Sequence, residues 1–597
     1  MAPRKLLRGL NGATLAMPLV LALLPVPPVA AQRVGGPGPL VSADGRVDWN
    51  RYYTSGETNA ILEHYARRYP GLTRLSSIGR SWRGADLMLM EVTNQATGPA
   101  DEKPALYLDG GIHAGELTGS AVALYVLGQL LDSYGTDPRI TQLLDTRTFY
   151  IRPKFNPDGA DLALIHDQSL RSTVHPVDSD GDGAADEDPP EDLDGDGWIT
   201  QMLVPDSTGE YVRDPADPRV VLDRPEGYAR GEFFRLISEG VDNDGDGRIN
   251  EDGIGGLDMN RNFPRNWEPE FLQPGAGAFP LSEPETYATV RFIDRHPNIT
   301  SIVHGHTSGG FVYRLPSASD PSKFDPTDLA LIEELGAYYT QTTNRPVRPS
   351  ATHPTEHRYG TLIEWAYQDR GVIGWVPEYS PADAWITDYD ADGSISEAER
   401  HRFNDDELGG RYFSPWREYD HPQLGRVEIG GWHSKFWGQN PPAEFLENEC
   451  RQQIDWILFL AEQSPLLQIT EPAITSLGED RWRIEVTVTN TGYLPTNLTE
   501  RGYMGRVREE GTITDQVVPP PVVGIELSDL VLDEGSARVS IPHLDGGNPH
   551  SKAVTERSHG VTWVVRATGP SPSLRIAARA DKGGVRRTAW VELATNQ

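Results

Sequence analysis

The chain of 597 residues contains a single cysteine, Cys450, so no disulfide can form within it. Basic residues are scarce: 54 Lys and Arg stand against 87 Asp and Glu, and the net charge of −33 disfavours binding to nucleic acid or to an anionic lipid surface. The mean hydropathy of −0.48 argues against a protein with many membrane spans. At this length we expect two or more domains.

The N-terminus has the pattern of a secretory signal. Basic Arg4, Lys5 and Arg8 precede the apolar run ATLAMPLVLALLPV, and the small residues VAA follow it just before Gln32. A membrane anchor is the alternative, but prolines interrupt a run that is already short for a bilayer span. We therefore expect residues 1–31 to be cleaved, leaving no membrane span. Together with the single cysteine, this predicts a bacterial protein that is secreted or periplasmic.

Alternating strands and helices are predicted from residue 48 to about residue 465, after a leader at 32–47. Strand-like runs lie at 72–79, 85–94, 104–111, 147–155, 298–306 and 371–379. Helical periodicity lies at 52–70, 119–134, 282–296, 328–343 and 443–463. This order predicts an α/β domain with a mixed twisted β-sheet flanked by helices, and an active site at the strand ends.

The pattern changes at about residue 466. Short runs such as RWRIEVTVTN and VTWVVRAT alternate apolar and polar residues between turn residues. Residues 466–597 are therefore predicted to form an all-β sandwich, an Ig-like accessory domain. We find no set of catalytic residues there and interpret it as a packing, carbohydrate-binding or partner-binding appendage.

The stretch DGGIHAGELTGS suggests part of a metal site. His113 and Glu116 lie where a predicted strand ends and a helix begins, so both side chains can reach one point at a sheet edge. A catalytic zinc needs three protein ligands and one open position for water. The run ITSIVHGHTSGG offers His304 and His306 as the third ligand, and strand alternation places both on the same face. Spacing alone does not choose between them.

Two further fragments fit a hydrolase. GLDMNRNFP holds Asn260 beside Arg261, and an Arg fork with an amide is suited to gripping a carboxylate. GWVPEYS ends a predicted strand on Glu378, a candidate general base. Each fragment alone also has an ordinary structural explanation: Glu116 as a helix cap, Asn260 as a turn residue and Glu378 as a surface residue.

Together the fragments resemble the zinc carboxypeptidases of the carboxypeptidase A type. HAGE is similar to their His-x-x-Glu zinc pair, NPDG (156–159) to a loop of the family, and DMNRNFP to their substrate clamp. HTSGG is similar to the strand end that carries the third ligand, and GTLIEWAYQDRGVIGWVPEYS to the segment that carries the catalytic Glu. The resemblance covers roughly residues 48–380 and the helix near 443–463, with five motifs in the same order.

The resemblance implies one catalytic zinc bound by His113, Glu116 and His306. We favour His306 over His304 because HTSGGFVYR is similar to the family's run after the ligand, and we keep His304 as the alternative. Arg171, in SLRSTVHP, resembles the Arg that polarises the scissile carbonyl.

The remaining implied roles concern the substrate and the attacking water. Asn260 and Arg261 would hold the substrate's terminal carboxylate, and Glu378 would activate water. Tyr359 would be the mobile Tyr that closes over the substrate.

Some features depart from the family pattern. Gly115 replaces an Arg that helps some members to bind substrate, which predicts a looser carboxylate grip. Inserts at about 160–255 and 383–440 would border the cleft and reshape it. Ile363 falls near the specificity-pocket position and favours apolar or aromatic C-terminal residues.

The inserts contain Asp-rich loops that resemble calcium-binding loops. DYDADGSISEAE (388–399) has the full pattern, whereas 178–188, 192–200 and 242–252 are less complete. A solvated acidic loop is the alternative in each case; if calcium binds, we expect it to be structural. The candidate ligands are Asp388, Asp390, Asp392, Ser394, Glu399, Asp242, Asp244 and Asp246.

Three functions are compatible with these features. The first is a secreted zinc metallocarboxypeptidase that acts on the C-termini of peptides or proteins. The second is a zinc amidase that acts on cell-wall peptides or N-acyl amino acids. The third is a non-catalytic, calcium-dependent binding protein, which the presence of every implied ligand and of Glu378 disfavours. The paired Asn260 and Arg261 favour the first, and the sequence indicates no particular oligomeric state.

Overall fold

The computed structural model describes residues 39–227, 231–317, 324–350, 358–381, 383–507 and 513–594. The predicted signal segment, residues 1–31, lies outside the described residues, as does part of the predicted leader. Within the described ranges, none of the helices combines the length and the apolarity that a bilayer crossing requires.

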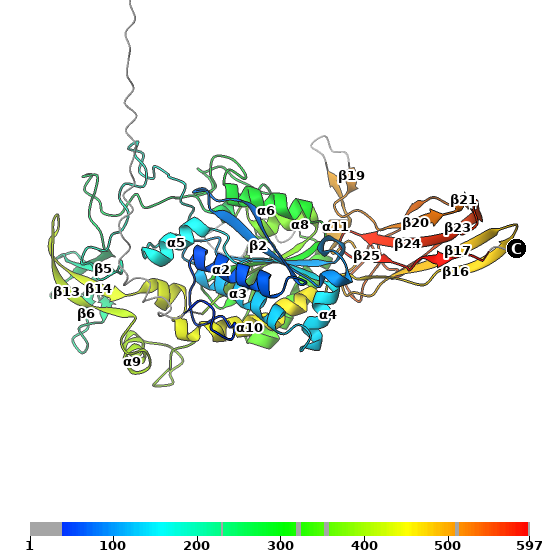
Figure 1. Ribbon diagram of the computed structural model, residues 1–597. Helices are drawn as coiled ribbons and strands as arrows, with labels where there is room; N and C mark the ends of the chain where they lie inside the picture. Colours follow the sequence, from blue (N-terminus) through cyan, green and yellow to red (C-terminus); the bar gives the residue numbers. More distant parts are fainter. Residues whose placement is uncertain are drawn as a thin grey trace, which may run out of the picture.

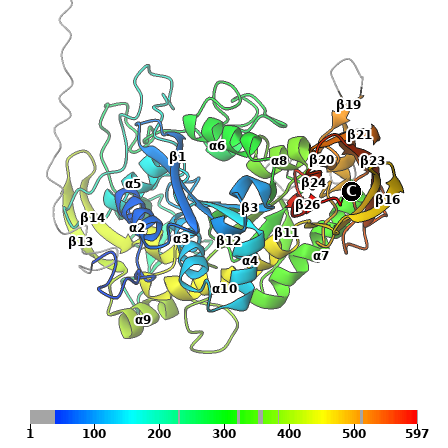
Figure 2. The ribbon, with the colours of Figure 1, turned by 45° about the vertical axis from the view of Figure 1, so that its right-hand side comes forward.

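A mixed eight-stranded sheet lies at the centre of the molecule (Figures 1 and 2), which confirms the predicted fold class. Its four middle strands are parallel, and antiparallel pairings flank them on both sides. Every residue of β3 and β9 is buried, as expected for parallel strands that are covered on both faces. In sheet order the strands are β1 (Thr73–Arg80), β2 (Asp86–Val92), β4 (Thr148–Arg152), β3 (Ala105–Gly110), β9 (Ile299–Thr307), β12 (Ile373–Tyr379), β10 (Phe311–Arg314) and β11 (Val347–Pro349).

Helices cover both faces of this sheet (Figure 1). Along β12, Trp375 contacts Trp456 of α10, with ring centroids 5.5 Å apart. The adjacent Gly374 lies against Ile363 of α8, so α10 and α8 cover opposite faces because strand side chains alternate. The helices are α2 (Ser55–Arg68), α3 (Leu117–Asp132), α4 (Pro138–Thr146), α5 (Pro157–Ile165), α6 (Pro284–Arg295), α7 (Pro326–Thr343), α8 (Leu362–Arg370) and α10 (Ala443–Glu462).

Helix α3 approaches the sheet through glycines. A Cβ on Gly119 would lie 2.6 Å from the carbonyl oxygen of Gly305 in β9, and a Cβ on Gly110 in β3 would lie 2.2 Å from the backbone of Gly119. Side chains at these positions would therefore push α3 away from the strands. This close packing fixes the loop that joins β3 to α3.

The two inserts form one structure rather than two separate loops. Their strands pair into a six-stranded antiparallel sheet, in which β14 of the second insert lies beside β5 of the first. Met202 and Ile429, one from each insert, share a small apolar core. The insert elements are β5 (Gln201–Pro205), β6 (Tyr211–Arg213), β7 (Val221–Asp223), β8 (Phe234–Ser238), α9 (Glu397–Leu408), β13 (Phe413–His421) and β14 (Gly425–Trp432).

The C-terminal part contains two antiparallel five-stranded sheets that share an apolar core, including Trp482 and Trp563 of one sheet and Ile525 and Ile576 of the other. It lies on the opposite side of the central sheet from the insert sheet (Figures 1 and 2). One sheet holds β15 (Leu467–Ile469), β16 (Ala473–Gly478), β17 (Arg481–Asn490), β21 (Leu530–Glu534) and β23 (Ser558–Ala567); the other holds β20 (Val522–Ser528), β22 (Arg538–Ser540), β24 (Ser573–Ala580), β25 (Gly584–Arg587) and β26 (Val591–Glu592).

Candidate functional site

The carboxyl ends of three neighbouring strands bring the predicted site residues together. His306 is near the end of β9 and is aligned with Glu378 near the end of β12. His113 follows β3, and Glu116 occupies the position before the first residue of α3. Because parallel strands end at the same edge of a sheet, residues almost two hundred positions apart meet there.

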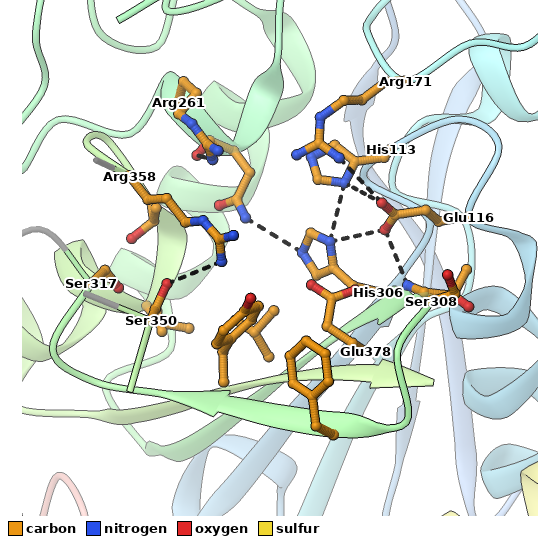
Figure 3. Close-up of a pocket in the computed structure, with 17 residues that line it drawn as sticks. His113, Glu116, Arg171, Arg261, His306, Ser308, Ser317, Ser350, Arg358 and Glu378 are labelled. Atoms are coloured by element: carbon orange, nitrogen blue, oxygen red, sulfur yellow. Dashed lines mark hydrogen bonds and ion pairs between the residues drawn. The ribbon is translucent and has the colours of Figure 1, made fainter. Parts of the chain in front are cut away.

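His113, Glu116 and His306 form a buried cluster (Figure 3). Glu116 Oε1 lies 2.7 Å from His113 Nδ1, and Glu116 Oε2 lies 2.9 Å from His306 Nδ1. The two Nδ1 atoms are 3.1 Å apart. Although burial opposes the shift, His113 and His306 lower the pKa of Glu116 well below its usual range, so this side chain is a carboxylate.

The geometry of these donors fits zinc. Tetrahedral zinc with bonds of about 2.0–2.1 Å places neighbouring ligand atoms about 3.3 Å apart. The three separations in the cluster approach that value, and the cluster faces a cavity of about 310 Å³ that leaves a side open. Two imidazoles and one carboxylate with an open position are a donor set of catalytic zinc sites.

His304 lies outside this cluster. Its Nδ1 is 2.6 Å from Asp109 Oδ1, inside the sheet, and both side chains are fully buried. Of the two histidines that the strand offers, the structure therefore brings His306, and not His304, to His113 and Glu116.

Asp258, which no sequence pattern pointed to, orients the cluster. Its Oδ1 lies 3.0 Å from His113 Nε2, and its Oδ2 accepts a hydrogen bond of 3.0 Å from Arg171 Nε. A carboxylate at Nε2 holds the His113 proton there and leaves Nδ1 with a lone pair that faces Glu116. Arg171, which also lies 3.4 Å from Glu116, is thereby held at the mouth of the cleft.

Asn260 and Arg261 lie on a single helical turn at the cleft. The 3-10 helix Met259–Arg261 begins at Asp258, whose side chain accepts a hydrogen bond from the Asn260 backbone N–H. Both side chains are buried and line the cavity, as the clamp hypothesis requires. Arg261 Nη1 donates to the Asn260 carbonyl oxygen at 2.9 Å, which fixes the direction of the guanidinium.

Glu378 lines the same cavity and lies beside His306 (Figure 3). Burial and the nearby Glu116 carboxylate raise the pKa of Glu378 to about 8. A carboxyl group with a raised pKa binds and releases a proton near neutral pH, which suits a general base.

The part of the cavity away from the cluster differs from the sequence prediction. Ile363 lines it, with Phe311 and Val376, as the expected apolar pocket requires. The guanidinium of Arg358 also lines it, whereas Tyr359 is not among the lining residues. Arg358 Nη1 lies 3.4 Å from Ser350 Oγ, and Figure 3 shows its side chain directed into the cavity.

The second insert supports the loop that carries His113. Asn440 Nδ2 donates to the Gly115 carbonyl at 2.7 Å, and Asn440 Oδ1 accepts from the Thr118 backbone N–H. A Cβ on Gly115 would lie 2.6 Å from Gln439, so Gln439 fills the space beside this glycine. These contacts link the end of the second insert directly to the cluster.

The predicted calcium loops lie in the inserts. In 388–399, Asp388 accepts from the backbone N–H groups of Ala391 and Gly393, and Glu399 accepts from Tyr389 N and Ser396 N. Asp390, Asp392 and Ser394 lie in the same exposed turn, and calcium binding by this loop stays a prediction. Asp242, Asp244 and Asp246 lie in a second such turn, beside a loop of the first insert.

Comparison with known proteins identifies the family. The sequence model of the zinc carboxypeptidases matches residues 58–196 and 224–389, which together exceed half of the chain, and a domain of unknown function matches residues 466–590. Carboxypeptidase A6 of Mus musculus is 34% identical over 122 residues, covering 20% of this chain and 27% of that protein. Carboxypeptidase B of Astacus astacus is 32% identical over 127 residues, covering 21% of this chain and 40% of that protein.

The chain is also similar to a further curated protein and to a solved structure. The inactive metallocarboxypeptidase ECM14 of Saccharomyces cerevisiae is 32% identical over 123 residues, covering 21% of this chain and 29% of that protein. The carboxypeptidase A structure from Helicoverpa armigera has a TM-score of 0.44 and 14% identity, covering 72% of this chain and 79% of that one. The chain thus aligns with less than half of each of the curated relatives named here. On the extent of the family match, this protein belongs to the zinc carboxypeptidase family.

Proposed function

We propose that the protein is a zinc-dependent carboxypeptidase that hydrolyses the last peptide bond of a chain with a free terminal carboxylate. The observation that carries this proposal is one cavity lined by the His113–Glu116–His306 cluster, by Glu378 and by Arg261. The cavity therefore offers a metal site, a proton acceptor and a fixed cation for the chain end.

The proposed chemistry divides among the residues around the cavity. When bound by His113, Glu116 and His306, zinc supplies Lewis acidity that polarises a carbonyl oxygen and makes water more acidic. Glu378 accepts a proton from the attacking water and delivers it to the nitrogen of the leaving amine. Arg171, held by Asp258, stabilises the negative charge that develops on the carbonyl oxygen.

Asn260 and Arg261 provide the selection for a chain end. A buried Arg beside an amide can bind a carboxylate through paired hydrogen bonds, and a chain that continues past this point has no carboxylate to offer. The distance between this clamp and the cluster then limits cleavage to the terminal bond.

The cavity also indicates the side chain of the residue that is released. Phe311, Ile363 and Val376 provide apolar walls, and the Arg358 guanidinium provides a positive charge. We propose that an acidic side chain with a short aliphatic stem, such as that of Glu, fits this pocket better than a basic one. This differs from the apolar or aromatic preference expected from Ile363 alone and agrees with it only in disfavouring basic residues.

Further parts of the proposal concern location and organisation. Residues 1–31 would direct export to the periplasm or medium, where calcium is available to the acidic inserts. Residues 48–465 would form the catalytic domain, and residues 466–597 an accessory β-sandwich domain, whose separate apolar core supports this division.

Substrate analogues with matched ends test the proposal. N-blocked dipeptides with a free C-terminus should release their last residue, whereas the corresponding amides should be cleaved far more slowly. Removal of zinc should abolish the activity, and added zinc should restore it. Mass spectrometry of a longer peptide should show loss of single C-terminal residues; internal fragments, or equal cleavage of acids and amides, would contradict the exopeptidase assignment.

A further inference from the structure

Two Asp-rich loops of the inserted region, residues 178–188 and 242–252, lie against each other; we call them the paired loops. The first loop's Asp188 accepts hydrogen bonds from the backbone N–H groups of Asn243 (2.9 Å) and Asn250 (2.6 Å) in the second. In return, Asp252 of the second loop accepts from a backbone N–H of the first at 3.3 Å. Each loop thus caps the other, although 53 residues separate them in sequence.

Carboxylates from both loops converge on shared points. Asp180 belongs to three groups, in each of which the candidate ligand atoms lie within 4.8 Å of one another. One of these groups combines Asp180 of the first loop with three residues of the second, so the convergence is a property of the pair and not of either loop alone. The groups are Asp180–Asp244–Asp246–Glu251, Asp178–Asp180–Asp252 and Asp180–Asp182–Glu187.

Buried oxygen atoms without hydrogen-bond partners face these points. Four carboxylate oxygens are buried and have no hydrogen-bond partner: both oxygens of Glu187, Oε2 of Glu251 and Oδ2 of Asp252. Asp252 is fully buried. A buried anionic oxygen needs a donor or a cation, because removal from water costs several kcal/mol per ion. Three such carboxylates beside the exposed aspartates therefore indicate a cation.

The other two Asp-rich loops lack this feature. Beside the loop 192–200, the buried Glu239 accepts hydrogen bonds from the backbone N–H groups of Leu193 and Thr200. In 388–399, Glu399 accepts from backbone N–H groups through both of its oxygens. Their buried carboxylates are already satisfied by the protein, which distinguishes the paired loops.

We propose that the paired loops jointly bind calcium, with Asp180 shared between neighbouring cation positions. Every donor of the three groups is a carboxylate oxygen, a set that selects hard cations over zinc. Calcium accepts six to eight oxygens in irregular geometry, whereas Mg²⁺ demands a near-ideal octahedron and retains water. A crowded set of carboxylates from two loops suits the larger ion.

The paired loops are connected along the chain to two residues of the cleft. Arg171 lies seven residues before the first loop, and Asp258 lies six residues after the second. These two segments are held together by the hydrogen bond from Thr173 N to the Leu257 carbonyl oxygen (2.9 Å) and by that from Gly255 N to Asp186 Oδ1 (2.8 Å). Calcium would therefore fix Arg171 relative to Asp258 and the clamp that follows it. This consequence for catalysis rests on the proposed function, whereas calcium binding itself does not.

The test compares two charge-removing substitutions in the same insert. Asp180→Asn removes the shared carboxylate and keeps an oxygen for the Asp182 backbone N–H. The matched control is Asp214→Asn, which also removes a carboxylate and keeps its hydrogen bond to Ala216 N, but lies outside the three groups. Both proteins are stripped of calcium, reloaded with equimolar zinc and titrated with CaCl2 by calorimetry and by thermal unfolding.

The wild type and Asp214→Asn should bind calcium with dissociation constants of millimolar or below, and their Tm should rise by several degrees at saturation. Asp180→Asn should bind calcium at least about tenfold more weakly at these positions and lose most of the rise in Tm. Equal calcium affinity and stoichiometry in the two variants, or no saturable binding by the wild type at 10 mM, would overturn the proposal.

A second variant separates ligation from folding. Glu187→Gln removes an unpartnered buried charge, so it should raise the Tm of the calcium-free protein and diminish the response to calcium. A purely structural role for Glu187 predicts instead a lower Tm with and without calcium. These measurements use no substrate, so they stand even if the carboxypeptidase proposal fails. With a substrate, calcium should lower KM or raise kcat in the wild type and in Asp214→Asn but not in Asp180→Asn.

Discussion

Replacement of Asp258 by Asn should weaken zinc binding without removing any proposed zinc ligand. Asp258 contacts His113 through one oxygen and Arg171 through the other, each at 3.0 Å. An Asn side chain can accept from only one of them, because its other end donates. If its NH2 group faces His113, the imidazole proton must move to Nδ1, on the side that faces Glu116. If it faces Arg171, two donors oppose each other beside a cation that has lost one of its two carboxylate partners and keeps Glu116 at 3.4 Å.

The magnitude follows from these contacts. Loss of a carboxylate that orients a metal-binding histidine typically lowers metal affinity about tenfold to hundredfold, or about 1.4–2.7 kcal/mol. The hydrogen bond to Arg171 is charge-assisted, but the Arg171 side chain is 53% exposed, so its loss costs about 1 kcal/mol of folding stability. We therefore expect both a weaker zinc complex and a lower Tm in the zinc-free protein.

The assay is zinc competition against a chromogenic chelator, with thermal unfolding in parallel. Asp137→Asn is the matched control, because Asp137 is a helix cap far from the cluster and Asn retains the capping hydrogen bonds. The control should match the wild type in zinc affinity. A zinc affinity of Asp258→Asn within twofold of the wild type would refute the orienting role of Asp258.

Three further substitutions give independent tests. Gly119→Ala places a Cβ 2.6 Å from the Gly305 carbonyl oxygen and should lower the free energy of unfolding by about 1–3 kcal/mol. The control Gly56→Ala lies in α2 where the space is open, so it should not lower the free energy of unfolding. Burial lowers the pKa of Lys582 to about 7 in the folded protein, whereas its pKa in the unfolded chain is about 10. Between these pH values the unfolded chain binds more protons than the folded protein, so stability should rise with pH there. Lys582→Met should flatten this rise in Tm with pH, and an unchanged slope would contradict the lowered pKa of Lys582. Arg358→Met should diminish a preference for substrates ending in Glu over those ending in Lys, and an unchanged ratio of the two kcat/KM values would contradict a role for Arg358 in recognising the released side chain.

Long apolar runs made the central sheet predictable. The strands β9 and β12 and the helices α3 and α10 lie where periodicity placed them, because interior strands and amphipathic helices carry patterns of many residues. Short elements were missed: α5 has nine residues and begins with the proline of NPDG. The insert sheet was also missed, since β5 pairs with β14 more than two hundred residues away and no local pattern encodes that pairing.

The residues of the candidate site were also predictable only in part. His113 and Glu116 were recognisable because two potential metal ligands three residues apart follow a predicted strand. The resemblance favoured His306 as the third residue, but spacing alone left His304 open. In the structure Asp109 contacts His304, and His306 lies beside His113 and Glu116. Asp258 lies only two residues before Asn260, yet an Asp in a loop carries no sign that it will face an imidazole. Likewise, the paired loops were predicted separately, and their mutual capping depends on a register that the sequence does not display.

Activity of Glu378→Gln at full zinc occupancy tests the proposed mechanism most directly. The substitution keeps the size of the side chain and removes its ability to accept a proton, and Glu63→Gln on the surface of α2 serves as the control. Metal content and Tm of both variants are measured before activity on an N-blocked dipeptide with a free C-terminus. We expect Glu378→Gln to retain zinc and to lose about 10²–10⁴-fold in kcat, while Glu63→Gln is unchanged. Wild-type turnover by zinc-loaded Glu378→Gln would contradict the role of Glu378 as the general base.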